Sequence, residues 1–429
     1  MEPYITVHKL GPIQDCSLDL KKVTVLTGPQ ACGKSTIAKV AYFFLTIPED
    51  FFVQASAVLN PEDYQTSLTV ALDKRLRNKF LGIFGSSWAM SPEMTMECQY
   101  AEDTWCKVSL KNPAKQADGH NFVIFTYSSN LKQFLGQHEN LSNRMENMEE
   151  RNGDCLRTQI HEMFQIDFET IYIPAGRGMI TLLTDQINYI FSAMDIPSQR
   201  SIDYCTRQYV SRILRLRPSF SGGARGLLQD QIHMTNQVID RKQMERVLQK
   251  MAEVLRGDYV YEGGEEHLRI ESKRFVKINY ASSGQQEIVW VLNFIFYYLL
   301  IRKNIFLIVE EPEAHLYPDA QKQITELLGM FANGENSIMI TTHSPYILGQ
   351  LNNMLLGNQL KNNDGEIIPT DQIIQESWIG AQHVHDGRIE NALTDGLIDN
   401  SLIDGASKDI NDLTDRLLEQ IWDEEEARK

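Results

Sequence analysis

The stretch KVTVLTGPQACGKST, which runs from Lys22 to Thr36, decides the fold of this chain. Residues 22–27 form a short run rich in β-branched side chains, which predicts a buried strand. Residues 28–35 fit the pattern G-x-x-x-x-G-K-[ST] at every position, and residues 35–45 have helical character. A strand, a glycine-containing loop and a helix in this order predict a phosphate-binding loop in an α/β protein.

Each part of this loop has a chemical reason. Glycines let the backbone curl so that its N–H groups face a phosphate, and the following helix adds the positive end of its dipole. Lys34 is expected to reach the β- and γ-phosphates of ATP, and the Ser35 hydroxyl to bind Mg²⁺. A glycine turn that arose by chance would lack the flanking strand and helix. The predicted nucleotide-binding residues are Gly28, Pro29, Gln30, Ala31, Cys32, Gly33, Lys34, Ser35 and Thr36.

A second apolar run, residues 305–309, ends in Glu310 and Glu311. Ligands bind at the carboxyl ends of strands in α/β sheets, and successive side chains on a strand diverge. The two carboxylates can therefore have separate roles, one supporting the Mg²⁺ shell and the other orienting or deprotonating the attacking water. The alternative is a solvated acidic strand end, which the intact phosphate loop disfavours.

Two further motifs follow the same logic. His343 ends the apolar run 337–341, where its ring could hydrogen-bond the γ-phosphate and report its loss. Residues 281–285 (ASSGQ) precede a long apolar helix, and a helix N-terminus of small residues can bind an anion. A plain Ser-Ser-Gly helix cap explains this second motif equally well.

The rest of the chain is organised around these motifs. Alternating runs at 5–10 and 16–20 predict a hairpin, and three β-like runs within 93–127 predict an antiparallel β-region. Residues 130–257 are mostly helical in character, apart from the strand-like IYIP at 171–174. The chain therefore divides into a first lobe (1–128), a helical insertion (129–258), a second lobe (259–393) and a polar helical tail (394–429).

Composition limits the function classes. The chain has 429 residues and a net charge of −16, which argues against a protein that coats nucleic acid but leaves room for a local basic groove. Its longest apolar stretch, 288–301, is interrupted by Asn293 and is typical of a buried helix rather than a membrane span. The sequence starts with no secretory signal, so we expect a cytoplasmic protein. Its six cysteines form no CxxC pair and are expected to be reduced, although Cys98 and Cys106 could face each other across a hairpin.

These four motifs, in this order, resemble the ABC-type ATPases of the chromosome-maintenance and DNA-repair branch. The opening, ITVHKLGPIQDCSLDLKKVTVLTGPQACGKST, is similar to the start of RecF-like and SMC-like heads. The run VEEPEAHLYP is most similar to the overcoming-lysogenisation-defect (OLD) class and its AAA-type relatives in bacterial anti-phage systems. The resemblance covers about residues 1–60 and 259–350. It implies a P-loop ATPase head with a mixed or parallel core sheet, an antiparallel β-region and a largely helical insertion.

The same resemblance implies roles for individual residues. Glu311 takes the position of the catalytic glutamate, and Glu310 stands where many relatives carry a metal-binding aspartate. His343 takes the position of the switch histidine, and the run YIPAGR (172–177) is associated with the OLD class. The residues implied to act in catalysis are Lys34, Glu311 and His343, those implied to bind metal are Ser35 and Glu310, and those standing for the signature are Ala281, Ser282, Ser283, Gly284 and Gln285.

In such ATPases the signature acts on the opposite subunit. Ser282 and Gly284 of one chain would bind the γ-phosphate that Lys34 of the other chain holds. The resemblance therefore implies a homodimer, or a higher even-numbered homo-oligomer, that closes on ATP and Mg²⁺ and opens after hydrolysis.

Two functions remain open. The first is the sensor or regulatory ATPase of a bacterial anti-phage system that controls a separate nuclease or toxin, because Asp395, Asp399 and Asp404 do not form a convincing TOPRIM nuclease set. The second is a RecF-like repair ATPase that binds DNA. An ABC transporter subunit would carry its signature much closer to the phosphate loop, and a zinc-hook ATPase would carry a CxxC. The discriminating feature is a cluster of arginines, namely Arg207, Arg212, Arg215, Arg217 and Arg225.

Overall fold

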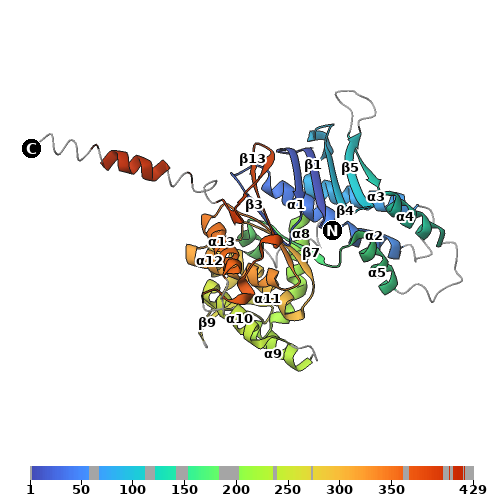
Figure 1. Ribbon diagram of the computed structural model, residues 1–429. Coiled ribbons are helices and arrows are strands. Elements are labelled where there is room, and N and C mark those ends of the chain that lie inside the picture. The colour runs from blue at the N-terminus through green and yellow to red at the C-terminus, as the bar shows by residue number, and fades with distance from the viewer. Residues whose placement is uncertain are drawn as a thin grey trace, which may run out of the picture.

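The computed structural model describes residues 2–57, 67–111, 121–141, 153–182, 202–234, 239–271, 274–360, 367–399, 405, 409–418 and 420. Among these residues, an eleven-stranded sheet in the order β6-β5-β4-β1-β2-β14-β13-β3-β12-β11-β7 forms the centre of the molecule. One half of the sheet is parallel and the other is antiparallel, and helices cover both halves (Figure 1). The predicted α/β class with a mixed sheet is confirmed.

The parallel half contains the strands that the motifs require. Each neighbouring pair in the series β13-β3-β12-β11-β7 is parallel, so all five carboxyl ends meet at one edge. These strands are almost entirely buried, as expected where helices cover both faces of a sheet. They are β3 (Val23–Thr27), β7 (Glu169–Ile173), β11 (Ile305–Glu310), β12 (Ser337–Thr341) and β13 (Ile379–His385).

The alternation of side chains along β11 decides on which side of the sheet Glu310 lies. The odd-numbered residues of β11 belong to the core that contains α11 (Ser283–Ile301). Phe306 and Ile308 belong instead to the core that contains α1 (Lys34–Leu45). Because side chains alternate along a strand, Glu310 continues the series of Phe306 and Ile308 and lies on the α1 side.

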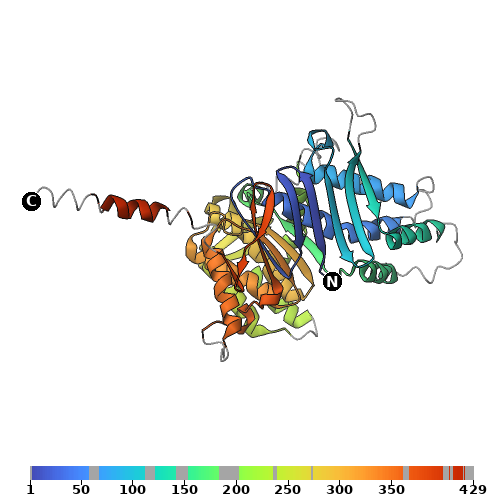
Figure 2. The same ribbon diagram turned by 45° about the horizontal axis from the view of Figure 1, so that its top comes forward.

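The antiparallel half extends the sheet away from this edge. Figure 2 shows these strands side by side with helices behind them. The predicted hairpin and the three predicted β-runs are all present. The strands are β1 (Tyr4–Leu10), β2 (Ile13–Asp19), β4 (Thr95–Ala101), β5 (Thr104–Lys111) and β6 (Phe122–Tyr127), and the helices that follow them in the chain or pack nearby are α2 (Ile47–Ala57), α3 (Leu68–Phe84), α4 (Ser129–Leu141) and α5 (Gly153–Phe164).

Cys98 and Cys106 are direct partners in the β4–β5 register, as their position around a turn suggested. Both thiols are buried and free, and burial raises the pKa of each. The other four cysteines are free as well.

The remaining elements lie beneath the parallel half. Helices α8 (Tyr204–Leu216), α9 (Gly223–Met234) and α10 (Arg241–Leu255) share one core with α11, α12 (Pro318–Asn333) and α13 (Pro345–Gln359). A small antiparallel sheet precedes α11. Its strands are β8 (Asp258–Glu262), β9 (Glu265–Glu271) and β10 (Arg274–Lys277), and short 3-10 turns lie at Arg217–Phe220, Ile278–Tyr280, Thr370–Gln372 and Glu376–Trp378. A further 3-10 turn, Ser87–Ala89, lies in the antiparallel half between α3 and β4.

Two parts of the carboxyl-terminal region differ from the prediction. No strand was predicted for 379–391, yet β13 enters the main sheet beside β3, and β14 (Arg388–Asn391) lies between β13 and β2. The run IGAQHVH carries little strand signal, because it mixes glycine, glutamine and histidine with few apolar residues. The predicted tail begins with β15 (Leu393–Thr394) and β16 (Leu397–Ile398), and a helical segment at 409–418 projects from the body (Figure 1).

The turn predicted at 112–119 and the tail end at 423–429 lie outside the described residues. None of the described helices is both long enough and apolar enough to span a membrane.

Candidate functional site

The phosphate loop joins β3 to α1 and depends on two glycines. Gly28 and Gly33 have φ values of 137° and 113°, which side chains disfavour. A Cβ on Gly28 would lie 2.1 Å from the carbonyl oxygen of Val384, and one on Gly33 would lie 2.3 Å from Cδ1 of Ile13. The positive φ favours glycine at both positions, and at Gly28 the contact with a backbone carbonyl also excludes a side chain. Pro29, Gln30 and Ala31 are exposed at its tip.

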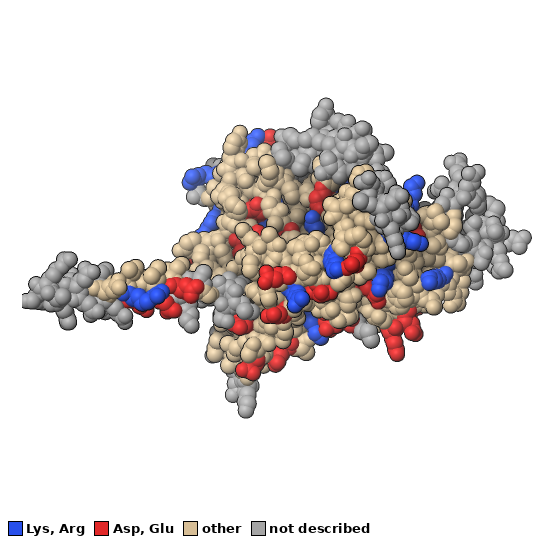
Figure 3. Space-filling model, turned by 90° about the horizontal axis from the view of Figure 1, so that it is seen from above, with Lys and Arg blue, Asp and Glu red and all other residues tan. Residues whose placement is uncertain are grey.

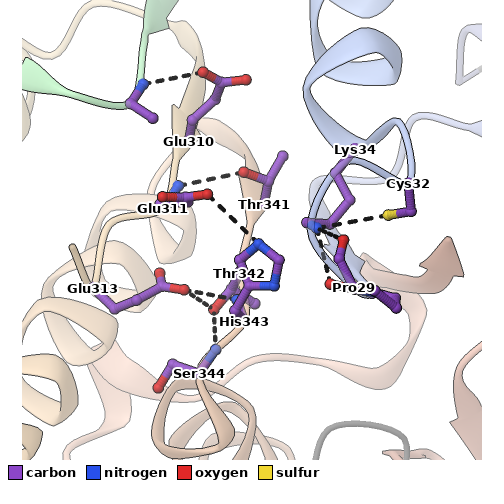
Figure 4. A network of polar contacts seen from close by, with 12 residues as sticks. Pro29, Cys32, Lys34, Glu310, Glu311, Glu313, Thr341, Thr342, His343 and Ser344 are labelled. Atoms are coloured by element: carbon purple, nitrogen blue, oxygen red, sulfur yellow. Dashed lines mark hydrogen bonds and ion pairs between the residues drawn. The ribbon is translucent and has the colours of Figure 1, made fainter. Parts of the chain in front are cut away.

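Lys34 lies folded against the loop that it follows. Its ammonium donates hydrogen bonds to the carbonyl oxygens of Gly28 (2.8 Å) and Pro29 (2.6 Å), and its Nζ lies 3.6 Å from Sγ of Cys32 (Figure 4). Burial lowers the pKa of Lys34, while the nearby Cys32, Glu311 and Glu313 act in the opposite direction. The ammonium is thus held at the mouth of the loop, facing the acidic edge of the sheet.

Glu310 ends β11 with its carboxylate only partly satisfied. The residue is 5% exposed, and its Oε2 accepts a hydrogen bond from the backbone N–H of Ala175 (3.0 Å). Its Oε1 is buried and forms no well-formed hydrogen bond with a described residue, although the carboxylate interacts with the buried hydroxyl of Tyr172. A buried carboxylate oxygen without a partner is costly unless something binds it, and hard cations such as Mg²⁺ prefer oxygen ligands. Together with the exposed hydroxyl of Ser35 at the start of α1, Glu310 has the chemistry of a magnesium ligand.

Glu311 and His343 face each other across the ends of β11 and β12 (Figure 4). Nε2 of His343 lies 3.6 Å from Oε1 of Glu311. His343 is the largest influence on Glu311 and holds the pKa of its carboxyl below the ordinary value, with a smaller contribution from Lys34. The carboxylate of Glu311 is therefore ionised near neutral pH. Its backbone adopts a left-handed conformation (φ 44°) that is anchored by an N–H bond to the carbonyl oxygen of Thr341 (2.9 Å).

Glu313 supports this arrangement, although the sequence analysis gave it no role. Its Oε1 accepts hydrogen bonds from the hydroxyl of Thr342 (2.7 Å) and from the backbone N–H of His343 (2.7 Å). Burial raises the pKa of Glu313. Because Glu313 holds the backbone of His343, it fixes the position from which the imidazole side chain projects. The sequence signal that could have identified Glu313 was its place as the third acid in the run EEPE, residues 310–313.

His383 is a second residue that the sequence analysis missed. It lies on β13, and its Nδ1 is 3.1 Å from the hydroxyl of Thr27, the last residue before the phosphate loop. Burial lowers the pKa of His383, and His385 adds to this effect. No sequence signal pointed to it, because β13 itself was not predicted.

A cavity of about 580 Å³ opens beside the first turn of α1. It extends from the start of that helix to the tip of the β1–β2 hairpin, so a molecule held by the phosphate loop could reach into it. Its lining residues are Lys9, Leu10, Gly11, Gln14, Ser35, Thr36, Lys39, Ile83, Phe84, Ser86, Ala89, Met90 and Ser91.

The residues that stand for the signature do not join this constellation within one chain. Among the described residues, no hydrogen bond or ion pair connects 281–285 to 28–36. Ser282 caps α11 and forms a reciprocal capping box with Gln285, so the helix-cap interpretation is correct as local structure. Ser282 and Ser283 are exposed, and a Cβ on Gly284 would lie 2.6 Å from the carbonyl oxygen of His315. The two serines are therefore accessible to an outside ligand, whereas Gly284 is packed against the backbone of His315.

The arginine cluster is largely neutralised. Arg212, Arg217 and Arg225 each form an ion pair with a glutamate, namely Glu169, Glu266 and Glu245. Arg207 stacks over the ring of Tyr204, and Arg215 bonds to the backbone of its own helix. In Figure 3, basic and acidic side chains also alternate over the described part of the face seen from above. Among the described residues, these five arginines therefore do not line one common groove. Arg225 does line a cavity of about 900 Å³ together with four other basic residues, namely Arg241, Lys242, Arg246 and Arg256, and with Glu245 and Glu253.

Comparisons with known proteins bear on the family of this chain. No curated protein matches the chain significantly. Solved structures with a similar course include an Smc head bound to the C-winged helix domain of ScpA, which is 11% identical, covers 90% of this chain and 95% of that chain, and has a TM-score of 0.39. The SMC head domain from Thermotoga maritima is 12% identical, with coverage of 92% and 100% and a TM-score of 0.36.

A third solved structure is the Smc head with an extended coiled coil bound to the C-terminal domain of ScpA, derived from Pyrococcus furiosus. It is 11% identical, covers 96% of this chain and 100% of that chain, and has a TM-score of 0.39. Likeness at this level supports no conclusion about function. The family model described as an AAA ATPase domain, in contrast, matches residues 4–348, which is most of the chain. The chain belongs to the AAA ATPase domain family.

Proposed function

We propose that this protein binds ATP with Mg²⁺ and hydrolyses it, and that the hydrolysis cycle opens and closes a dimer of two identical chains. The observation that carries the proposal is the meeting of three motifs at one edge of the sheet. The phosphate loop follows β3, the acids follow β11 and His343 follows β12, and the three strands are neighbours. The phosphate loop lies more than 270 residues before the acids and His343 in the sequence, and a shared nucleotide gives a reason for all three to meet at one edge.

The chemistry divides among the residues of this chain. The loop N–H groups and the Lys34 ammonium hold the β- and γ-phosphates, displacing the two carbonyl oxygens that the ammonium now contacts. Ser35 and Glu310 hold Mg²⁺, which when bound neutralises developing phosphate charge. Glu311 accepts a proton from the water that attacks the γ-phosphorus, and His343 orients that water or the γ-phosphate. The bond to the β–γ bridging oxygen breaks, giving ADP and phosphate.

The exposed signature supports the dimeric part of the proposal. Ser282 and Ser283 are exposed at the N-terminus of α11, where Ser282 is engaged only within its own capping box, and among the described residues no phosphate-loop residue of the same chain bonds to them. A second copy placed head to tail would bring them to the γ-phosphate held by Lys34. Two-fold symmetry then yields two composite sites in each dimer.

Two variants test the proposal. Lys34→Ala should abolish ATP binding in equilibrium dialysis. Glu311→Gln should retain binding, lower kcat by a factor on the order of 10² to 10⁴ because the general base is lost, and accumulate an ATP-bound dimer in sedimentation velocity. Glu97→Gln, on strand β4 of the antiparallel half, is the matched control and should behave as the wild type does. Turnover of Glu311→Gln at the wild-type rate would refute this assignment of the base.

The biological role that we propose is that of a regulatory ATPase in a bacterial anti-phage system, controlling a separate nuclease or toxin. It is supported by the similarity of VEEPEAHLYP and YIPAGR to the OLD class. The structure adds that this second run lies directly against the acidic edge, through Ala175 and Arg177. Copurification from the native operon, followed by mass spectrometry, should recover an effector chain whose activity changes between ATP and ADP. Recovery of no such chain, or activity independent of nucleotide, would count against this role.

The DNA-binding alternative has a direct test as well. A RecF-like ATPase should bind duplex DNA in fluorescence anisotropy with an affinity that falls steeply with salt. The ion pairs of Arg212, Arg217 and Arg225 predict weak binding, and tight salt-dependent binding would favour this alternative over the regulatory role.

A further inference from the structure

The feature that stands out beyond the proposed site is a fully buried arginine. Arg177 is 0% exposed and begins a helical stretch, 177–182, shortly after β7 and Pro174. A guanidinium cannot lose its charge in a protein, and burying it is costly unless nearly every N–H finds an acceptor. The hydrogen-bond partners of Arg177 therefore indicate its role.

One group of partners belongs to the acidic edge. Nη1 donates to the carbonyl oxygens of Pro174 (3.0 Å) and Glu310 (2.5 Å), and Nη2 donates to that of Glu311 (3.0 Å). The guanidinium thus donates hydrogen bonds to the backbone of both Glu310 and Glu311. Because its donors form a rigid fork, it fixes where these two residues leave the strand.

The other partner is Glu287, in the first turns of α11, two residues after Gln285. The backbone N–H of Arg177 donates to its Oε2 (2.9 Å), Nε donates to its carbonyl oxygen (2.9 Å), and Nε also lies 3.4 Å from its Oε2. Glu287 is itself 5% exposed. One buried side chain therefore binds both the acidic edge and the helix that carries the signature.

Backbone N–H groups of the segment around Arg177 also connect the acidic edge to α11. The N–H of Ala175 donates to the carboxylate of Glu310, whereas the N–H of Arg177 donates to the carboxylate of Glu287. Gly178 fits closely here, since a Cβ on it would lie 3.1 Å from Oε1 of Glu287. The segment 174–178 is therefore bonded to both carboxylates at once, so that a shift of Glu310 or of Glu287 acts on this segment and, through it, on the other glutamate.

We propose that Arg177 is a positioning residue that couples the acidic edge of one ATP site to the signature helix that completes the other. This inference rests on the proposed dimeric ATPase. When a ligand engages Glu310 and Glu311, any shift of their carbonyl oxygens is transmitted through the guanidinium to α11, and a ligand at the signature acts in the reverse direction. Each chain then links the two composite sites, which predicts cooperativity in ATP.

The test compares Arg177→Lys and Glu287→Gln with the control Arg217→Lys. Lysine keeps the charge at position 177 but cannot reach all of these acceptors, and glutamine keeps the shape of Glu287 without its charge. Arg217 also forms a buried pair, with Glu266 (3.4 Å), but it touches neither acid of the edge. Three readouts are taken, namely ATP affinity, the kcat and Hill coefficient of turnover, and hydrogen exchange in the first turn of α11.

Exchange is measured with and without ATPγS and Mg²⁺, at a protein concentration where sedimentation shows a monomer. Direct contact by a second copy is then absent. We expect ATPγS to slow exchange in the wild type and in Arg217→Lys but not in the two test variants. We also expect the test variants to bind ATP within about twofold of wild type while kcat falls at least tenfold and the Hill coefficient falls toward one.

Two results would overturn the coupling. One is an ATPγS effect on α11 that persists in Arg177→Lys or is missing from the wild type. The other is a loss of turnover that follows the loss of melting temperature equally in all three variants, which would show a merely structural role. A wild type that does not hydrolyse ATP would refute the proposed function instead, and the exchange readout would still decide the role of Arg177.

Discussion

Single residues set the shape of the phosphate loop, because its backbone passes within van der Waals distance of two other segments. Gly28 approaches the backbone of β13, and Gly33 approaches the β1–β2 hairpin. The motif is usually explained by contact with a phosphate, but here the protein alone already excludes a Cβ at Gly28, where it would meet a backbone carbonyl, and strains one at Gly33, whose φ is 113°.

Gly28→Ala tests this explanation without nucleotide. Its Cβ would meet the carbonyl oxygen of Val384 at 2.1 Å, and its φ of 137° is unfavourable for alanine, so we expect a loss of at least about 2 kcal/mol in the free energy of unfolding. Gly136→Ala is the control, since it lies in α4 with no atom near the new Cβ and should gain up to about 1 kcal/mol. Urea denaturation measures both, and equal stability of the two variants would contradict the argument.

Glu313 gives a prediction about pH. Burial raises its pKa above the ordinary value of 4.5, so folding favours the protonated form. The contribution of this group is fully present below pH 4.5 and is lost as the pH rises through its folded-state pKa. Glu313→Gln, which can still accept both hydrogen bonds, should therefore gain melting temperature relative to wild type as the pH rises from 4.5 to 7.

Thermal melts at several pH values measure this difference between variant and wild type. Glu102→Gln, on the exposed β4–β5 turn, controls for the loss of one charge and should show a flat difference. A difference for Glu313→Gln that stays constant or falls with pH would mean that the carboxylate is stabilised by its two donors more than burial destabilises it.

At the scale of elements, helix α11 combines two unlike properties. Its body is apolar and buried against the sheet, whereas its N-terminus exposes Ser282 and Ser283 and carries the capping box of Ser282 and Gln285. The cap satisfies backbone N–H groups that would otherwise be free, so Ser282 has a structural reason to be where it is. The proposed contact with a partner's phosphate adds to this reason and does not compete with it.

Substitutions of Ser282 separate the two roles. Ser282→Ala should lose about 1 kcal/mol of stability through the cap alone. Ser282→Arg should lose a similar amount, keep nucleotide binding to the monomer, and abolish ATP-dependent dimerisation in sedimentation, because its bulk occupies the proposed interface. Asp240→Ala removes the cap of α10 at a similar cost and should leave dimerisation intact. Normal closure by Ser282→Arg would remove the signature assignment.

At the scale of the whole molecule, two cores lie on opposite faces of one sheet, and the proposed site lies at the edge where they meet. The face with α1 supplies the phosphate loop, and the face with α11 supplies the signature. Arg177 passes between them at the end of β7. The projecting segment at 409–418 belongs to neither core, and its Ile410, Leu413 and Leu417 are more than half exposed.

Truncation distinguishes the projecting segment from the strands before it. Ending the chain after residue 399 removes no buried described side chain, so the melting temperature should shift by less than about 2 °C. Ending it after residue 391 should be much more harmful, because Ile398 is 2% exposed and exchanges two hydrogen bonds with Asn352. A large loss from the first truncation would show that 409–418 packs against the protein in solution.

The sequence by itself determined the local chemistry of this protein. Strand, glycine loop and helix at 22–45, the apolar strands before Glu310 and before His343, and the antiparallel runs within 93–127 could all be predicted. Each depends on patterns only a few residues long, such as β-branched runs and fixed spacings of glycine, lysine and serine. The helix cap at Ser282 could be predicted for the same reason. The role of Ser282 as a signature residue remains a prediction.

Only the tertiary structure decided which distant residues meet. β13 enters the sheet beside β3 because hydrogen bonding to its neighbours overrides a weak intrinsic preference, and it brings His383 to the loop. The pairing of the arginines, the support of His343 by Glu313 and the burial of Arg177 between two carboxylates depend on long-range packing. No local pattern specifies such contacts, since they join segments that the chain brings together only when both cores have formed.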